Sequence, residues 1–598
     1  MAASTRIKKP VAPRPAHWLD GTQHETWHST APKDVVEAYT EGDGQEGWEA
    51  WTDHLEGRRN RPYLGTLLRG GEESLLWGMP ASLRESETAE LVKQLGRANS
   101  FEKRKQRRRW ADLIADWLDS ASIASASTAY AYECLAYTHS LVQLTSCIGE
   151  NLWWKLVNHL TTMAREARQQ DALTDPLVWQ LLAGELPLAL AYLLPEIRVC
   201  QDQSLVAWST IAQGLNELVD EGGVPATPVV PLLPALVASW TRARAIADRV
   251  TKDSWQDPAS VRYESTLLCL ARIGEVDQDL WRAAEKFTQQ KKARRLLRQL
   301  ADGQVVTAKM RLPFPAIHSE KNCFGLLRST WATDAPSLTV SYSDPVPRIE
   351  LVCQGEVLCS GPWRFDVSLD GEPRTVTGRW DIVCWYSDKD VDFLEIEAPL
   401  GDGLKVQRQF LLARQDEVLL LADAVVADRP ARINYDASLP IATHVGFHGA
   451  EETREGHLVG NDARALVLPL ELSEWRSDSH SGSLEMTSAG LTLRHSRLGS
   501  AIYAPLFLDL NKNRSKEECT WRKLTVAAQR VPQRADVAVG FRAQIGKTNW
   551  LVYRSLAEPG IRSLLGQQVK AEFLFGRMKR NGGCARLLEI ESIEPTES

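Results

Sequence analysis

The stretch that decides the fold is KKARRLLRQLADGQVV, residues Lys291–Val306, because the spacing of apolar residues changes within it. Before it, from about Tyr63 to Leu300, apolar residues recur at intervals of three and four, which is typical of amphipathic helices. After it, short apolar segments alternate with Gly and Asp turns, which is typical of antiparallel strands. The sequence therefore predicts two domains that meet around Ala301 to Val306.

The N-terminal half is predicted to be entirely helical. Turn signals such as Gly222-Gly223 separate several of the helices, whose apolar stripes must be buried against one another. This organisation predicts a solenoid or a closed ring of helical hairpins. The predicted helices are Phe101–Ala121, Ala129–Ser146, Glu150–Arg168, Pro176–Leu194, Ser204–Leu218, Leu232–Arg249, Pro258–Ile273 and Asp277–Leu300.

The C-terminal half is predicted to be an antiparallel sandwich or barrel. Segments such as Leu338–Tyr342, Arg348–Val352 and Val418–Asp423 are short and rich in apolar residues. Turns such as Asp370-Gly371 and Gly401–Gly403 separate them. Many short strands with such turns favour a layered all-β domain.

Composition limits the classes of function. The chain has 598 residues, of which 43% are hydrophobic and 25% charged, so it is expected to fold, as at least two domains. A net charge of -7 argues against a nucleic-acid binder driven by bulk charge. Ten scattered cysteines without a CxxC pair favour reduced thiols, with no metal site and no cofactor. Because neither a signal peptide nor a long apolar run is recognised, we expect a cytoplasmic protein without a membrane partner.

Three stretches carry a resemblance to a known family. They are Leu194–Pro228, which begins LPEIRV and ends LNELVDEGGVPATP; Cys323–Asp344, CFGLLRSTWATDAPSLTVSYSD; and Trp380–Val425, which begins WDIVCWYSDKDVDFLEIEAPL. With the order of a helical and then a β domain, they resemble the heparinase II/III-like polysaccharide lyases. The resemblance implies an N-terminal extension (1–60, partly disordered), an incomplete α/α toroid (61–302) and an antiparallel β-sandwich (303–598). It also implies a substrate in the cleft between toroid and sandwich.

The residues that usually carry out β-elimination in this family are not found where the resemblance places them. The reaction needs a group that neutralises the uronate, a base that takes the neighbouring proton and an acid that protonates the leaving oxygen. In the family these roles usually fall to an Asn, a Tyr and a His. The Asn should fall near 177–179, where only Gln180 has an amide; the Tyr falls at Val230, beside Pro231; the His falls near Ser343. Val and Pro cannot carry a proton.

Two functions follow as alternatives. The first is a divergent heparinase II/III-like protein that acts on or binds acidic polysaccharide or oligosaccharide, by β-elimination with non-standard residues if it is active. The second is a catalytically inactive glycan-binding or protein-interaction scaffold. The residues expected to contact a glycan flank the family's catalytic positions: Trp179, Gln180, Tyr342, Asp344 and Arg348. Catalytic residues and oligomeric state are not assigned.

Other polar residues offer weaker alternatives, each with a structural explanation. Histidines on apolar helices are usually structural, charge runs usually form solvated faces, and short metal-binding patterns are prone to false matches. The alternatives are Tyr137 with His139, Asn158 with His159, His318 near the domain boundary, His444 with His448, Asp390 with Asp392, the HExxH pattern of His24, Glu25 and His28, and the basic run Lys103–Arg109.

Overall fold

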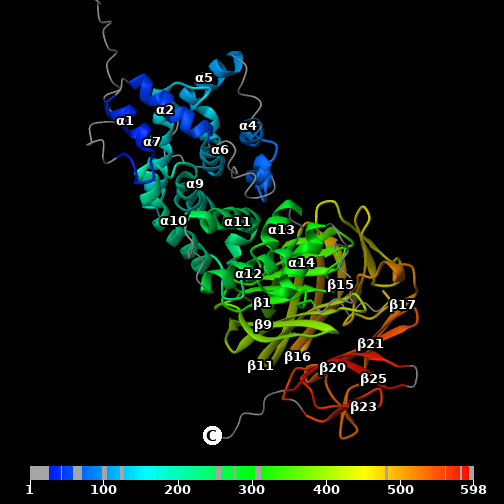
Figure 1. The fold of residues 1–598 in the computed structure, drawn as a ribbon. Coiled ribbons are helices and arrows are strands. Elements are labelled where there is room, and N and C mark those ends of the chain that lie inside the picture. The colour runs from blue at the N-terminus through cyan, green and yellow to red at the C-terminus, as the bar shows by residue number, and fades with distance from the viewer. Residues whose placement is uncertain are drawn as a thin grey trace, which may run out of the picture. The chain divides into compact units, whose positions relative to one another are not determined.

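The structure, a computed structural model, describes residues 26–41, 44–57, 71–96, 104–120, 127–170, 173–250, 257–274, 278–302, 312–332, 334–477, 482–558, 560–579 and 582–591. Contacts within the chain divide it into two compact units, Met1–Gln304 and Val305–Ser598. The first unit is helical and the second consists of antiparallel strands (Figure 1). The predicted class, a helical domain followed by an antiparallel β domain, is confirmed.

The helical unit follows the predicted helices closely between 104 and 273. Helix α10, for example, begins six residues before the predicted Ser204–Leu218 and ends one residue before its end. The described helices are α1 (Lys33–Glu41), α2 (Gly44–Gly57), η3 (Gly71–Leu76), η4 (Ala81–Leu83), α4 (Glu87–Gly96), α5 (Arg104–Ser120), α6 (Thr128–Leu144), α7 (Glu150–Ala167), α8 (Pro176–Trp179), η7 (Gln180–Glu185), α9 (Leu186–Leu193), α10 (Arg198–Glu217), η8 (Thr227–Leu232), α11 (Leu233–Val250), α12 (Asp257–Ile273), α13 (Gln278–Glu285) and α14 (Lys291–Ala301).

The segment expected as an N-terminal extension contains two helices in its described part. Helices α1 and α2 lie within 33–57, and the fully buried Trp51 of α2 packs edge-on against Trp153 of α7, with ring centroids 6.0 Å apart. Trp27 packs against Trp51 at 5.3 Å. Burial of these large aromatic surfaces stabilises the segment against the helical unit, although its sequence has no long apolar stripe. The described part of the expected extension, 26–57, is thus helical and packs against α7, whereas residues 1–25 lie outside the described residues; the boundary at 60 stays a prediction.

The single helix predicted over Asp277–Leu300 is two helices. After α13, the buried carboxylate of Glu264 accepts hydrogen bonds from the backbone N–H groups of Gln289 (2.7 Å) and Gln290 (3.1 Å). Gln289 and Gln290 come directly before α14, whose N-cap residue is Gln290, so Glu264 of α12 caps the start of that helix. A cap from a residue about 25 positions away leaves no local sequence signal.

The β unit contains four antiparallel sheets among its described residues. The first has the order β1-β2-β3-β4-β5. The second runs β12-β13-β14-β16-β11-β10-β9-β8, with β15 on β16 and β6 and β7 attached to β11. The third has the order β17-β20-β21-β24-β25, and the fourth β19-β18-β22-β23. The strands are β1 (Ile317–Ser319), β2 (Phe324–Arg328), β3 (Ser337–Ser341), β4 (Arg348–Cys353), β5 (Glu356–Pro362), β6 (Arg364–Leu369), β7 (Glu372–Arg374), β8 (Asp381–Ser387), β9 (Val391–Gly401), β10 (Leu404–Ala413), β11 (Val418–Leu439), β12 (Gly446–Gly449), β13 (Gly456–Val459), β14 (Arg464–Pro469), β15 (Ser483–Thr487), β16 (Gly490–Asp509), β17 (Cys519–Leu524), β18 (Ala527–Ala528), β19 (Val531–Pro532), β20 (Ala538–Ile545), β21 (Thr548–Ser555), β22 (Arg562–Leu564), β23 (Gln567–Val569), β24 (Phe573–Met578) and β25 (Cys584–Ile590).

The second sheet is the middle layer of this unit, because its strands are buried on both faces. In β11, Leu419 and Leu421 pack into a core with residues of the first sheet, whereas Leu420 packs into a core with residues of the third. Successive side chains of a strand point to opposite faces, so a strand between two layers needs apolar residues at every position. This explains the unbroken apolar run at the start of β11.

A buried ion pair joins two neighbouring strands of the middle layer. Arg408 of β10 lies opposite Asp423 of β11 and donates two hydrogen bonds to its carboxylate, at 2.8 and 2.7 Å. Both side chains are completely buried. The Tyr435 hydroxyl also donates to Asp423, at 2.6 Å, and the guanidinium of Arg408 lies 3.8 Å from the ring centre of Trp363. All the charged atoms therefore have partners, which a buried pair requires.

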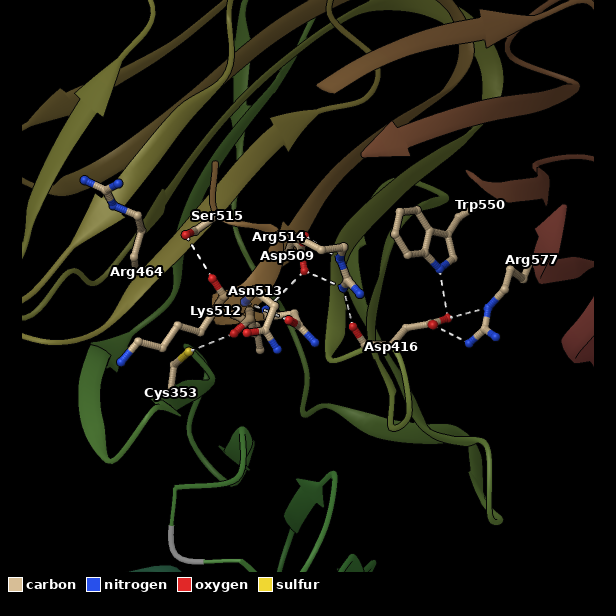
Figure 2. A network of polar contacts seen from close by, with 12 residues as sticks. Cys353, Asp416, Arg464, Asp509, Lys512, Asn513, Arg514, Ser515, Trp550 and Arg577 are labelled. Atoms are coloured by element: carbon tan, nitrogen blue, oxygen red, sulfur yellow. Dashed lines mark hydrogen bonds and ion pairs between the residues drawn. The ribbon is translucent and has the colours of Figure 1, made fainter. Parts of the chain in front are cut away.

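A second polar network joins the middle layer to the third sheet (Figure 2). In the turn between β10 and β11, the Asp416 carboxylate accepts hydrogen bonds from the indole N–H of Trp550 (2.9 Å) and from Arg577 (3.1 Å). At the end of β16, Asp509 accepts two from Arg514, at 2.9 and 2.6 Å. Asp416 and Asp509 are each hydrogen-bonded to an arginine. The network therefore stabilises the contact between strands and does not provide a pair of free carboxyl groups for catalysis.

Candidate functional site

The five residues predicted to contact a glycan lie in both units. Trp179 and Gln180 belong to the helical unit, at the junction of α8 and η7. Tyr342, Asp344 and Arg348 lie at the end of β3, in the following turn and at the start of β4.

Gln180 is fully buried within the helical unit. Its carboxamide donates to the Thr210 carbonyl oxygen at 3.0 Å and accepts from the Trp240 indole N–H at 2.7 Å. A Cβ atom on Gly214 would come within 2.3 Å of the Gln180 amide nitrogen, so glycine is needed there to make room. Trp179 is only 6% exposed. A glycan would reach Gln180 only by replacing these hydrogen bonds, and the prediction of a contact at either residue stays a prediction.

The turn that should carry the family's catalytic tyrosine is the short 3-10 helix η8, Thr227–Leu232. Val229 is buried, Val230 is half-buried and Pro231 is exposed. Asp220 and Gly223 form the preceding turn, in which Gly223 has φ +75 and a Cβ atom would come within 2.2 Å of the Thr266 backbone nitrogen. This turn therefore has room for glycine alone at 223, and Val229, Val230 and Pro231 of η8 carry no group that exchanges a proton.

The β unit brings a histidine and a tyrosine together. His318 of β1 and Tyr342, which directly follows β3, are joined by a 2.8 Å hydrogen bond between the His318 Nε2 and the Tyr342 hydroxyl. Their rings are nearly parallel, at 3°. On the other side, Trp385 of β8 stacks on the His318 ring with centroids 5.1 Å apart. His318 and Trp385 are half-buried, whereas Tyr342 is 2% exposed, so a ligand would meet His318 and Trp385 first.

Strand register explains why these residues meet. His318 pairs with Gly325 of β2, and Gly325 pairs with Val340 of β3. A Cβ atom on Gly325 would come within 2.9 Å of Leu394 in the middle layer, so this row faces the second sheet. Tyr342 lies two positions beyond Val340 and therefore points to the same side. The His–Tyr pair thus lies between the first sheet and the β8 edge of the second.

Arg348 and Asp344 do not share this side of the first sheet. Arg348 is exposed and pairs with Ser341, whose neighbour Tyr342 points to the opposite face. Asp344 is exposed in the turn between β3 and β4. Of the three residues predicted from this hairpin, Tyr342 alone joins the His318 cluster, and the roles of Asp344 and Arg348 stay predictions.

The electrostatic environment keeps the Tyr342 hydroxyl protonated. Burial, followed by the nearby Cys323 and Glu320, raises the pKa of Tyr342 well above its usual value. Burial also raises the pKa of the Cys323 thiol, which Arg379 opposes. The Arg379 side chain is paired at 2.8 Å with Asp381 at the start of β8.

A second histidine–tyrosine pair lies in the helical unit. The Tyr130 hydroxyl of α6 is 2.5 Å from the Nε2 atom of His159 in α7. Trp117 of α5 stacks on Tyr130 and donates its indole N–H to Glu133 at 2.8 Å. Burial lowers the pKa of His159. The three helices α5, α6 and α7 are thereby joined by one polar–aromatic contact, a structural role that needs no ligand.

Several of the remaining alternatives from the sequence are buried or paired within the protein. Burial lowers the pKa of His139 to about 3, which keeps this helical side chain neutral. Asp392 is buried and hydrogen-bonded to Ser387 at 2.7 Å, and His444 pairs with Glu356 at 3.0 Å. Within the described residues, no group of three or more His, Cys, Asp or Glu could hold a metal ion. His24 and Glu25 of the HExxH pattern lie outside them.

One helical stretch, Pro176–Leu193, is long and apolar enough to cross a membrane; it was the only one found in the part of the chain that the structure describes. It comprises α8, η7 and α9, and 89% of it is buried inside the structure. Such burial is typical of a core helix. The break from α-helical to π-helical hydrogen bonding falls at Gln180. Insertions of this kind often accompany functional positions in helices.

Sequence reasoning had noted His318 and Tyr342 separately and missed that they touch. They are 24 positions apart, and their contact depends on two strand registers. Trp385, the third member, was not singled out. Its only local signal was its place in a stretch that carries the family resemblance.

Comparison with solved structures shows the fold. Similar structures include the heparinase III-BT4657 gene product (TM-score 0.61, 12% identity, 89% of this chain and 99% of that chain). A heparan sulfate lyase HepC mutant from Pedobacter heparinus has a TM-score of 0.59 at 11% identity, covering 90% of this chain and 99% of that one. A heparinase III crystal structure has a TM-score of 0.61 at 9% identity, covering 89% and 99%. No family model and no curated protein matches the sequence.

This chain therefore has the fold of the heparinase III-type lyases, an α/α toroid followed by a β-sandwich, as the resemblance predicted. The similarity extends over nearly the whole length of both chains. At identities of 9–12% it defines the architecture, and function has to be argued from the chain's own residues.

Proposed function

We propose that this protein acts on an acidic polysaccharide or oligosaccharide by β-elimination, with His318 as the group that moves the proton. The proposal rests on one observation: the half-buried His318 is hydrogen-bonded to the buried Tyr342 hydroxyl, and Trp385 stacks on the His318 ring. A partly exposed base oriented by a buried partner is the arrangement from which general bases are built. The fold shared with polysaccharide lyases supports the choice of ligand.

The geometry suggests how the pair would work. With its Nε2 hydrogen-bonded to the Tyr342 hydroxyl, the His318 imidazole accepts the proton from the carbon next to the uronate. The electron pair left on that carbon forms the new C=C bond as the bond to the glycosidic oxygen breaks. The imidazolium then returns its proton to that oxygen, so the histidine ends as it began. Tyr342 is a positioning residue here, because its hydroxyl remains protonated and largely covered.

Two further groups would assist. A cation near the uronate makes the neighbouring proton easier to remove, and Arg379, whose charge acts on the Cys323 thiol, could serve as that cation. The Trp385 ring offers an apolar face of the kind that stacks on sugar rings. Both residues lie on or beside β8, the edge strand of the second sheet.

A second candidate function is a glycan-binding protein without catalytic activity. The observation that favours it is the absence of a proton carrier at Val230 and Pro231, together with the complete burial of Gln180. In that case Trp385 and His318 would contact the sugar, and no bond would break.

Turnover and binding measured on the same samples separate the two functions. The protein is incubated with a panel of uronic-acid polymers, and the ultraviolet absorbance of the unsaturated product is followed. The proposal expects a steady rise with at least one polymer. Binding by calorimetry without any rise would overturn the lyase and favour the second candidate, whereas neither binding nor turnover would overturn both.

A further inference from the structure

Helix α14 presents an unusual concentration of positive charge. Between Lys291 and Asp302 there are five cations, Lys291, Lys292, Arg294, Arg295 and Arg298, and one acid. With Glu285, which pairs with Arg294 and Arg298, the local balance is five positive against two negative charges, a net of +3 in a chain whose total is -7. The five cationic side chains are exposed.

The cations share one face of the helix. Lys291, Arg294, Arg295 and Arg298 follow the spacing that places residues on one side of a helix. Together with Gln299 and Asp302 they line an open hollow of about 640 Å³. From Lys291 to Arg298 the stripe is about 10 Å long at the helical rise per residue. It is thus long enough to meet several charges of a linear polymer.

Helix stability does not explain this arrangement. Lys291 and Lys292 occupy the first turn, where the helix dipole disfavours cations, and that turn has no acidic residue. Neighbouring like charges on one face also repel one another. Glu285 neutralises part of the charge, through hydrogen bonds from Arg298 at 3.0 and 2.5 Å. Among the described residues, Lys291 and Arg295 have no ion pair.

The buried face of α14 excludes insertion of this helix into a membrane. A basic helix that inserts into lipid needs a free apolar face. In α14 the apolar residues Ala293, Leu296 and Leu297 are buried within the protein. The exposed face therefore offers cations in a row and little else, which suits a ligand with repeated negative charges.

We propose that the cationic face of α14, formed by Lys291, Arg294, Arg295 and Arg298, is a docking surface for a polyanionic glycan bearing uronate or sulfate groups. The choice of a glycan rests on the proposed function, whereas the surface itself rests on the charge and geometry of α14. A docking surface on the helical unit would hold the polymer chain independently of the residues that break its bonds.

The surface is tested by binding in the full-length protein. Affinity for heparan sulfate and for unsulfated alginate is measured by calorimetry at several salt concentrations, for the wild type and for Lys291→Glu/Arg295→Glu. The expected loss is about fivefold for each cation removed, or about 25-fold for the pair, with a weaker dependence on salt. The control, Lys155→Glu/Lys516→Glu, makes the same charge change at exposed lysines of α7 and of the β unit and should bind like the wild type.

Each outcome decides the proposal. If the α14 variant and the control lose affinity equally, binding reflects total charge and the docking surface is overturned. Equal affinity for double-stranded DNA of the same length would overturn the assignment to a glycan. Should the charge reversals prevent folding, as judged by circular dichroism, Lys291→Gln/Arg295→Gln provides the same comparison. Turnover on short substrates is measured separately. If the wild type binds the polymer through α14 but turns over no substrate, the proposed elimination fails and the docking surface stands.

Discussion

Removing Arg408 should destabilise the β unit strongly, because it leaves the buried Asp423 carboxylate without its cation. In Arg408→Met, Asp423 loses both charge-assisted hydrogen bonds, of 2.8 and 2.7 Å, and keeps the one from Tyr435. Breaking a completely buried pair by removing one partner costs about 3–5 kcal/mol. The methionine fills much of the arginine's volume, so packing accounts for a small part of this loss.

Hydrogen–deuterium exchange of the full-length protein measures this cost locally. When exchange proceeds through unfolding of the β unit, a loss of about 3–5 kcal/mol accelerates exchange of β10 and β11 amides by roughly a hundredfold to several thousandfold. The double variant Arg408→Met/Asp423→Leu also removes the unpaired charge of Asp423. It should recover much of the protection of the β10 and β11 amides against exchange. Acceleration of less than about tenfold in Arg408→Met would refute the reasoning, since it would mean that Asp423 tolerates burial alone.

Three further perturbations follow from the same contacts. Gly214→Ala should destabilise the helical unit by about 1–3 kcal/mol in urea unfolding, since its Cβ atom would displace the Gln180 carboxamide; an unchanged midpoint would contradict this. Three backbone N–H groups at 461–463 lower the pKa of Glu356 to about 2, so their stabilisation is complete above the ordinary carboxyl pKa and is lost as pH falls toward 2. The protection factors of the amides at 461–463, taken relative to the intrinsic exchange rate at each pH, should therefore fall over that window, and Glu356→Gln should remove this change in protection. Burial keeps Tyr342 protonated beyond the usual value of 10, so a spectrophotometric titration of the wild type minus Tyr342→Phe should show that phenol ionising later; a difference centred at 10 would contradict its burial.

The order of the two architectures was predictable because each has a local period. The amphipathic spacing of 104–273 and the apolar start of β11 both follow from burial on one face or on two. The length of β11 was not predictable. Asp428, Arg429 and Pro430 have the composition of a turn, yet the strand continues to Leu439 with a register shift between Val426 and Ala431. Pairing with β6 and β16 overrides the local signal.

The candidate site was only partly predictable for a similar reason. Sequence alone identified Tyr342 and noted His318, but their contact is made by strand register, which no short motif encodes. Gln180 was expected at a surface because its amide lies where the family carries an asparagine. Its burial depends on Thr210, Gly214 and Trp240, which the folding of α10 and α11 brings beside it.

The most direct measurement of the central claim is the rate of unsaturated product formation by His318→Gln on the best uronic-acid polymer. If His318 moves the proton, the rate should fall by about 10²–10⁴-fold, while Tyr386→Phe, a neighbouring change on β8, should leave it unchanged. Binding of the polymer should persist in both variants. A His318→Gln protein that eliminates as fast as the wild type would contradict the assignment of the site.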